Sequence, residues 1–427
     1  MIGVKGNSID IILNGIKAIL PDLEKVYEDI HSNPELSFHE TRTATIIANR
    51  LNDAGFKFKT GIGKTGVVGI LVNGNGPTVM IRADMDALPV KENTGLPYAS
   101  MVTAVDESGR SVPVMHACGH DMHVTWLLGA ARILADNRKS WKGTLVVLFQ
   151  PAEETGKGAS AMIEGGLMED FPKPDVILGQ HVMVGEAGNI GWCSGPATSI
   201  SDSLIIRLFG RGSHGSMPQT SIDPVVMAAS LVLRLQTIVS REIDPSEFAV
   251  LTVGSVQAGQ KDNVIPDEAT LLVNTRSLND KTRSQILSAI DRITNAESGA
   301  SGATKSPEIR AFEHYPIVYN DPEATKMVVD SFQSFLGPDR VIEVKPTSAS
   351  EDFGIFGKEW KSPSVFWFVG GTDPEVYRKA QKEDSVNTIP ANHNPKFHPV
   401  LHPTLETGVQ SLILAVTPWL FRGLGEQ

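Results

Sequence analysis

The stretch HVTWLLGAARILADNRKSWKGTLVVLFQ, residues 123–150, contains the pattern that decides the fold. Its first part, His123–Ala135, predicts a helix, and Gly143–Gln150 is an apolar run of the length of a buried strand. The neighbouring sequence repeats these elements, with strands expected at Thr65–Val72, Thr78–Asp84 and Asp175–His181 and a helix at Thr41–Ala54. Helices that alternate with apolar strands predict an α/β domain around a central sheet.

A different order of elements follows between residues 199 and 314. A strand at Ser203–Phe209 and a helix at Asp223–Val239 precede two further strands, a second helix and a last strand at Glu308–Glu313. This order predicts a small α+β sandwich in which two helices cover one face of a sheet. We therefore expect an inserted domain at 199–314, between two parts of the α/β domain at 1–198 and 315–427.

The composition is that of an ordinary enzyme. The chain has 427 residues, 41% of them hydrophobic, and a formal net charge of −11. This charge argues against a nucleic-acid partner, because binding to phosphates needs clustered Lys and Arg. Two cysteines and a first segment unlike a signal peptide indicate a cytoplasmic protein. No apolar run reaches the roughly 18–20 residues of a membrane span, so we expect no membrane insertion.

Side chains that bind metals end several of the predicted strands or follow them closely. They are Cys118 and His120, Glu153 and Glu154, His181, and His393. Donors that are far apart in sequence converge in open α/β sheets, because the strand ends meet at one edge. The set suits one divalent metal ion, or two ions that share a ligand. Taken singly, a histidine is more often a structural residue than a ligand and a cysteine is usually a small buried hydrophobic residue, whereas Cys118 and His120 together suit either reading equally.

The adjacent acids Glu153 and Glu154 suggest a division of labour. Neighbours in an extended strand point to opposite sides. One carboxylate could then bind metal while the other accepts a proton from water. The alternative is a solvated loop that leads into a helix beginning at Thr155. Acidic side chains are stabilised at the start of a helix by its dipole.

Eight motifs together resemble one known family. The chain is similar to the metal-dependent amidohydrolases of the aminoacylase and carboxypeptidase family, especially the branch with hippurate hydrolases and auxin-conjugate hydrolases. The resemblance implies a central mixed sheet flanked by helices, like that of the zinc exopeptidases, and an inserted α+β dimerisation domain. The motifs run in order along nearly the whole chain: HSNPELSFHE (31–40), RADMDALPV (82–90), MHACGHDMH (115–123), FQPAEET (149–155), GRGSHGSMPQTSIDPV (210–225), DNVIPDEA (262–269), SEDFG (350–354) and HNPKF (393–397).

The resemblance also implies roles for individual residues. It makes Glu153 the general base and gives Asp86 the task of orienting a metal-binding histidine, although Asp84 stands where relatives have a histidine. The cofactor it implies is zinc, manganese, cobalt or nickel, one or two ions per subunit. The implied metal ligands are Cys118, His120, Glu154, His181 and His393.

Three residues of the inserted domain are implied in substrate handling. His214 would reach the active site of a partner subunit in a homodimer, or in a tetramer, and stabilise the oxyanion. Asn263 would bind the substrate carbonyl and Arg276 its carboxylate. The site is expected between the two domains, which would close around the substrate.

The predicted reaction is hydrolysis of the amide bond of an N-acyl amino acid. Alternatives within enzymes are a metallo-carboxypeptidase or dipeptidase, and an amidase whose nucleophile is Cys118 with His120 or His123 as base. An alternative of another class is a metal-dependent protein that binds acyl amino acids without turnover. The presence of Glu153 argues against this last class, because a binding protein needs no base beside its ligands.

Overall fold

The structure is a computed structural model that describes residues 6–421, and the chain divides into two compact units. Unit 1 contains the chain up to residue 197 together with 319–345 and 352 onward. Unit 2 contains Thr198–Val318 and Pro346–Glu351. The short return at 346–351 was not predicted. It belongs to unit 2 because Ser199 Oγ donates to the Ser348 carbonyl at 2.9 Å and Arg276 Nη1 to the same oxygen at 2.8 Å.

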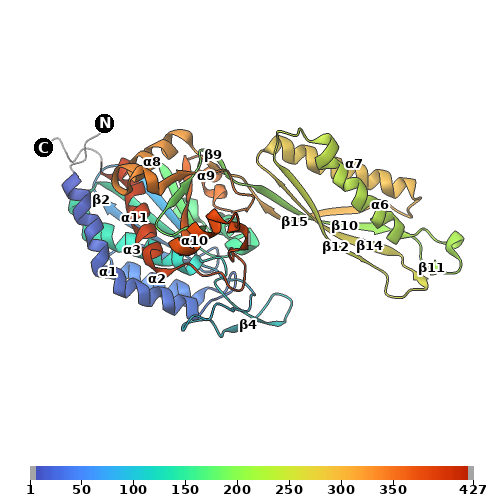
Figure 1. The fold of residues 1–427 in the computed structure, drawn as a ribbon, viewed down its shortest axis with the longest axis horizontal. Helices are drawn as coiled ribbons and strands as arrows, with labels where there is room; N and C mark the ends of the chain where they lie inside the picture. Colours follow the sequence, from blue (N-terminus) through green and yellow to red (C-terminus); the bar gives the residue numbers. More distant parts are fainter. Residues whose placement is uncertain (1–5, 422–427) are drawn as a thin grey trace. The chain divides into compact units, whose positions relative to one another are not determined.

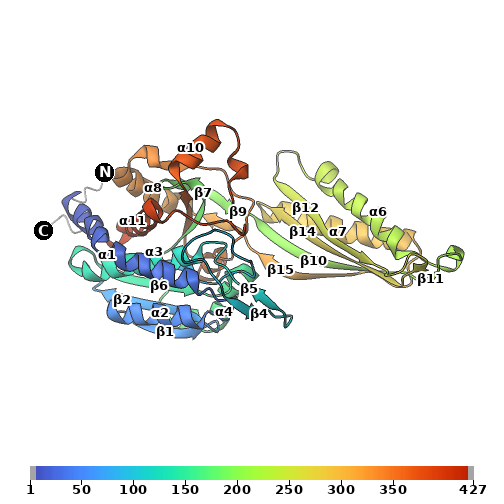
Figure 2. The ribbon, with the colours of Figure 1, turned by 60° about the horizontal axis from the view of Figure 1, so that its bottom comes forward.

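Unit 1 is built on an eight-stranded mixed sheet (Figures 1 and 2). Its parallel centre joins β3 to β6 and β7, and β7 to β18, whereas β1 and β2 pair antiparallel at one edge. The prediction of a mixed central sheet flanked by helices is therefore confirmed. In spatial order the strands are β1 (Lys57–Ile62), β2 (Gly66–Asn73), β6 (Gly143–Gln150), β3 (Thr78–Asp84), β7 (Val176–Glu186), β18 (Ser364–Thr372), β8 (Ile190–Trp192) and β17 (Val341–Glu343).

Alternation along the strands sends side chains to both faces of this sheet. In β18, Val365 and Trp367 join the large core, whereas Phe366 points the other way and packs against Phe353, with ring centroids 5.0 Å apart. The helices that contribute to the large core are α1 (Gly6–Ser32), α2 (Thr41–Asp53), α3 (His120–Asp136), α8 (Pro322–Leu336) and α11 (Leu401–Leu420). The remaining helices of unit 1 are α4 (Gly158–Glu164), α5 (Leu167–Asp170), α9 (Gly354–Trp360) and α10 (Pro374–Lys382), and a hairpin joins β4 (Thr103–Val105) to β5 (Ser111–Pro113).

Unit 2 is a four-stranded antiparallel sheet with two helices packed on one face (Figure 2). Its apolar core contains alternate residues of the central strands, such as Leu271 and Val273, together with Leu231 and Ile290 of the helices. The strand order is β12 (Ala249–Ala258), β14 (Glu268–Ser277), β10 (Ile200–Phe209), β15 (Glu308–Tyr315), the helices are α6 (Pro224–Thr237) and α7 (Asp280–Ala300), and a two-stranded pair is formed by β11 (Ser213–His214) and β13 (Val264–Ile265).

One helix is longer and more apolar than the sequence reading allowed. Pro224–Glu242, which is α6 with its continuation, reaches 19 residues at a mean hydropathy of 1.2. The expectation that no such run exists was wrong on length and composition. Yet Met227, Leu231 and Leu235 of this helix lie in the core of unit 2, and the core helix of a globular domain meets the same criteria. It is therefore weak evidence for a membrane span.

Candidate metal centre and active site

A tight turn before α3 places the first two donors of the centre. Gly119 has φ +86°, and a Cβ there would lie 2.4 Å from Val182 Cγ1, so glycine alone fits this position. Cys118 precedes the turn and His120 is the first residue of α3, with both side chains buried. The helix was predicted to begin at His123. It begins at His120 because the left-handed glycine lets the chain enter the helix directly after Cys118.

The two adjacent acids lie in a 3-10 turn after β6. Ala152 has φ +51°, and the turn spans Glu153–Thr155. The amide nitrogens of Glu153 and Glu154 each donate to one oxygen of the Asp86 carboxylate at 3.1 Å. The extended strand assumed for these residues was therefore wrong, and so was the solvated loop, because both carboxylate side chains are 7% exposed. The turn still orients the two acids differently.

Two further donors come from β7 and from the loop before α11. His181 was expected at the end of a strand, but β7 continues to Glu186, so this histidine lies within the strand. Its Nδ1 donates to the Val182 carbonyl at 2.7 Å, which leaves a lone pair on Nε2, 3.5 Å from Cys118 Sγ. His393 donates its amide N–H to the Ala117 carbonyl at 2.7 Å.

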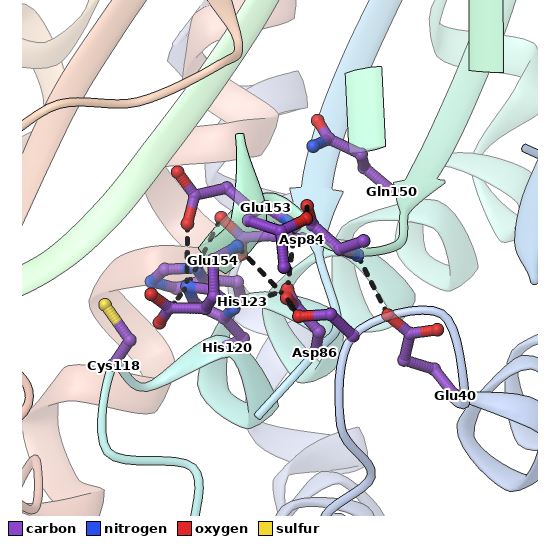
Figure 3. A network of polar contacts seen from close by, with 12 residues as sticks. Glu40, Asp84, Asp86, Cys118, His120, His123, Gln150, Glu153 and Glu154 are labelled. Atoms are coloured by element: carbon purple, nitrogen blue, oxygen red, sulfur yellow. Dashed lines mark hydrogen bonds and ion pairs between the residues drawn. The ribbon is translucent and has the colours of Figure 1, made fainter. Parts of the chain in front are cut away.

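The five predicted ligands form one cluster within unit 1. Donor atoms of Cys118, His120 and Glu154 all lie within 4.8 Å of one another (Figure 3). His393 Nε2 is 3.3 Å from Glu154 Oε2, and His181 adjoins the thiol as described. Side chains separated by up to 275 positions along the chain thus meet at one point. His393 is the most accessible of the five, with 56% of its side chain exposed.

The donors fit a divalent cation on physical grounds. His120 Nε2 and Glu154 Oε1 are buried without a hydrogen-bond partner and face each other at 3.8 Å. Such atoms carry a desolvation cost that a cation between them would remove. Burial raises the pKa of the Cys118 thiol well above its usual value, and the carboxylates of Glu154 and Glu153 raise it further. A metal ion would reverse that shift and hold the thiolate.

Burial has the opposite effect on the His181 imidazole. It lowers the pKa of that ring well below 6.5. The ring is therefore neutral at pH 7, which is the form that binds metals.

A buried network behind the donors orients them. Asp86 lies 3.2 Å from His120 Nδ1, the position expected of a carboxylate that orients a metal-binding histidine. Arg82 donates to Asp84 at 2.6 Å, and Asp84 contacts His123 Nδ1. Burial works to raise the pKa of Asp84, but the charges of Arg82, His120 and His123 hold it well below its usual range.

Two residues link separate parts of the centre in a way that was not predicted: His123, named above only as an alternative base, and Asn392, which was not named. His123 accepts a hydrogen bond from the Val182 amide at 2.9 Å, so both of its ring nitrogens are engaged. Asn392 donates from Nδ2 to the carbonyl oxygens of Cys118 and Val182, each at 3.0 Å. The signal for both was their place beside predicted ligands, but their partners lie far away in the sequence.

Within unit 2, the three predicted substrate residues do not meet. His214 pairs with Val264 in the β11–β13 ladder, and the Gly215 amide donates to the Asn263 carbonyl at 2.8 Å. Arg276 instead lies near the opposite end of β14, where it pairs with Ser201 and donates to Ser350 Oγ at 2.9 Å. The His214–Asn263 pair and Arg276 are thus separated by most of the length of a ten-residue strand.

The mixed sheet and the donor cluster define a metal-dependent hydrolase. The model of peptidase family M20/M25/M40 matches residues 80–411. The hippurate hydrolase of Campylobacter jejuni is 40% identical over 350 residues, 81% of this chain and 87% of its own length. The chain belongs to this peptidase family and is an amidohydrolase enzyme that binds a divalent metal.

Two further comparisons extend this result. Thermostable carboxypeptidase 2 of Saccharolobus solfataricus is 35% identical over 395 residues, 91% of this chain and 93% of its own length. A solved structure from Bacillus subtilis, described as a dinuclear metal-binding peptidase of the family, is similar with a TM-score of 0.74 and 29% identity. This similarity covers 94% of this chain and 99% of that one, so the likeness includes both units.

Proposed function

We propose that the protein hydrolyses N-acyl amino acids to a carboxylic acid and a free amino acid, with Glu153 as the general base. The observation that carries the proposal is the turn at Glu153–Thr155. It points Glu154 at the donor cluster and leaves the carboxylate of Glu153 beside it, 4.0 Å from His120 Nε2. The ligands in this proposal are Cys118, His120, Glu154, His181 and His393.

The chemistry that a divalent ion supplies in such a site is polarisation of the amide carbonyl and a lower pKa for water. Zinc, manganese, cobalt and nickel all suit this mixed set of thiolate, imidazole and carboxylate donors, as one ion or as two. Glu153 removes the proton of the attacking water and then delivers it to the leaving amine nitrogen. Its carboxylate side chain is only 7% exposed, which keeps bulk water from competing for that proton.

His214 supplies a hydrogen-bond donor to the developing oxyanion. Its Nδ1 accepts the Ser216 amide N–H at 3.1 Å, so the neutral ring carries its proton on Nε2. The side chain is exposed, which suits a residue that acts on a site outside its own unit. Asn263, next to it in space, contributes to binding of the substrate carbonyl, and Arg276 binds the substrate carboxylate.

We propose a homodimer in which His214 serves the partner's site. The separation between His214 and Arg276 supports this, because one small substrate cannot bridge the length of a strand. Unit 2 also exposes apolar side chains on α6 and on the edge strand β12: Val225, Val226, Leu233 and Val256. An apolar patch and an unpaired strand edge are typical of an interface. The cytoplasmic location expected from the sequence remains a prediction.

The named carboxypeptidase relative favours one alternative, hydrolysis of a peptide rather than an acyl amino acid. Both reactions use the same centre and differ in the group that precedes the scissile carbonyl. The Cys118 amidase is disfavoured by the raised pKa of the buried thiol, and in the version with His123 as base also because both nitrogens of that ring are engaged.

A panel of substrates tests the proposal. Metal-stripped protein is assayed with N-acetyl, N-benzoyl and indole-acyl amino acids and with dipeptides, while zinc, manganese, cobalt and nickel are restored one at a time. We expect turnover of at least one acyl amino acid that depends on added metal. Activity that survives chelation would favour the cysteine amidase, and binding without turnover would favour a binding protein.

A further inference from the structure

The segment 33–40, between α1 and α2, contains one of the most buried carboxylates of the molecule. Glu40 is 0% exposed. Its carboxylate accepts the amide N–H of Phe38 at 2.9 Å and that of Ala152 at 2.8 Å. Its other oxygen accepts the hydroxyl of Thr65. One side chain therefore joins three segments, and one of them is the turn that carries Glu153 and Glu154 (Figure 3).

Each of these three segments adopts an unusual backbone conformation at that point. Phe38 has φ +64°, Lys64, just before Thr65, has φ +80°, and Ala152 has φ +51°. They are three of the six non-glycine residues with positive φ in the described part of the chain. Such conformations persist where the surroundings over-determine them, and they cluster at functional sites. Here Glu40 binds the amides of Phe38 and Ala152 and the hydroxyl of Thr65, which directly follows Lys64.

The same segment reaches the turn by a second route. The consecutive amide groups of Ala152, Glu153 and Glu154 donate to two carboxylates, the first to Glu40 and the other two to Asp86. Ser37 Oγ donates to Asp86 Oδ2 at 2.7 Å. Two carboxylates thus fix the turn. Residue 40 supplies one of them, and residue 37 binds the other, that of Asp86.

We propose that Glu40 is a positioning residue for the catalytic turn, which sets the direction of Glu153 by holding the amide of Ala152. This inference rests on the proposed role of Glu153 as the base. Glu40 touches neither the donor atoms nor substrate. A displacement of about 1 Å at a reacting group can cost about 10²-fold in rate, so the loss of this one bond is measurable.

The experiment compares Glu40→Ala with Glu40→Gln, which keeps an acceptor oxygen for the Ala152 amide. We expect kcat of the alanine variant to fall about 10²-fold with KM and metal content little changed, and kcat of the glutamine variant to stay within about 3-fold of wild type. Thr65→Val, which removes one donor to Glu40 and leaves the Ala152 bond, provides a milder variant if alanine impairs folding. The kcat of Thr65→Val should lie between those of the Glu40→Ala and Glu40→Gln variants.

Glu35→Gln is the matched control. This carboxylate of the same segment accepts the amides of Arg42 and Thr43 at 2.9 and 2.8 Å, at the start of α2. It should lower the thermal midpoint without changing kcat. A glutamine variant of Glu40 no better than alanine, or a loss of activity that follows loss of metal, would overturn the inference.

Hydrogen exchange at the amides of residues 152–154 separates this inference from the proposed function. The amide of Ala152 should be protected in wild type and in Glu40→Gln, and exposed in Glu40→Ala. This readout needs no turnover, so it holds even if the substrate panel is negative. Equal protection in all three proteins would contradict the inference.

Discussion

The candidate site residues of the two units are held in very different ways. In unit 1, His120 and Glu154 are buried, and Asp86 fixes both through the imidazole and the amide of the turn. In unit 2, His214 is exposed and contacts Ser216, two residues away. A centre that must hold a cation needs fixed donors, whereas a residue that meets a substrate or a second subunit needs access. The donors of unit 1 are therefore fixed before a metal ion binds, whereas His214 in unit 2 is accessible to a substrate or a second subunit.

The largest effect is expected from removal of the base. Glu153→Gln should lower kcat about 10³-fold, because the amide cannot take the proton of water, while metal content stays that of wild type. The matched variant Glu154→Gln should lose metal as well as activity. Steady-state kinetics and metal analysis of both proteins check this. Equal metal loss in the two variants would contradict the assignment of Glu153 as the base and Glu154 as a metal ligand.

His214→Ala should lower kcat about 10²-fold without loss of metal, since one donor to the oxyanion is removed. Mixed dimers sharpen the comparison between the units. A Glu153→Gln subunit paired with a His214→Ala subunit contains one site with both wild-type groups if His214 acts on its partner. Co-refolding the two inactive variants should therefore restore activity. No recovery in dimers of verified mixed composition would place His214 in the site of its own chain, or in none.

A smaller effect is expected from the carboxylate behind the centre. Asp86→Asn should weaken metal binding about 10-fold, because a neutral amide orients His120 less strongly than a carboxylate. Titration of the stripped protein with zinc measures this. Ser37→Ala, which removes one donor to Asp86 and keeps its charge, should weaken binding less. An unchanged affinity in Asp86→Asn would show that the ring orientation is set elsewhere.

The buried pair of His31 with Asp121 predicts a change of stability with pH. Burial works to lower the pKa of His31, but the carboxylates of Asp121 and Glu92 raise it to about 9. A pKa above the unfolded value of 6.5 means that the stabilisation is complete below pH 6.5 and is lost as the pH rises through 9. It amounts to about 3 kcal/mol.

Thermal unfolding between pH 6 and 10 tests this. The midpoint should fall by several degrees across that range in wild type. It should fall much less in His31→Gln, which keeps a donor of similar size. Parallel curves for the two proteins would contradict the assignment.

Local elements could be predicted well from the sequence and the orientation of side chains poorly, while the metal ligands remain a prediction whose side chains lie in one cluster. The ends of β3 and β6 agree with the predicted runs, because buried strands are marked by continuous apolar residues. The turn at Glu153 could not be read, since Ala152 carries no signal for a positive φ. The roles of Glu40 and Asn392 could not be predicted either, because their partners lie more than 110 and 200 positions away in the sequence. Long-range partners of this kind are decided by tertiary packing.

Five donors that are distant in the sequence are proposed to hold a divalent ion beside the carboxylate of Glu153. Anomalous diffraction from crystals grown with zinc tests this proposal most directly. We expect a zinc peak bonded to Cys118 Sγ at about 2.3 Å and to His120 Nε2 at about 2.1 Å, with the carboxylate of Glu153 outside bonding distance. A peak bonded to Glu153 in place of Glu154, or zinc bound elsewhere with this cluster empty, would contradict it.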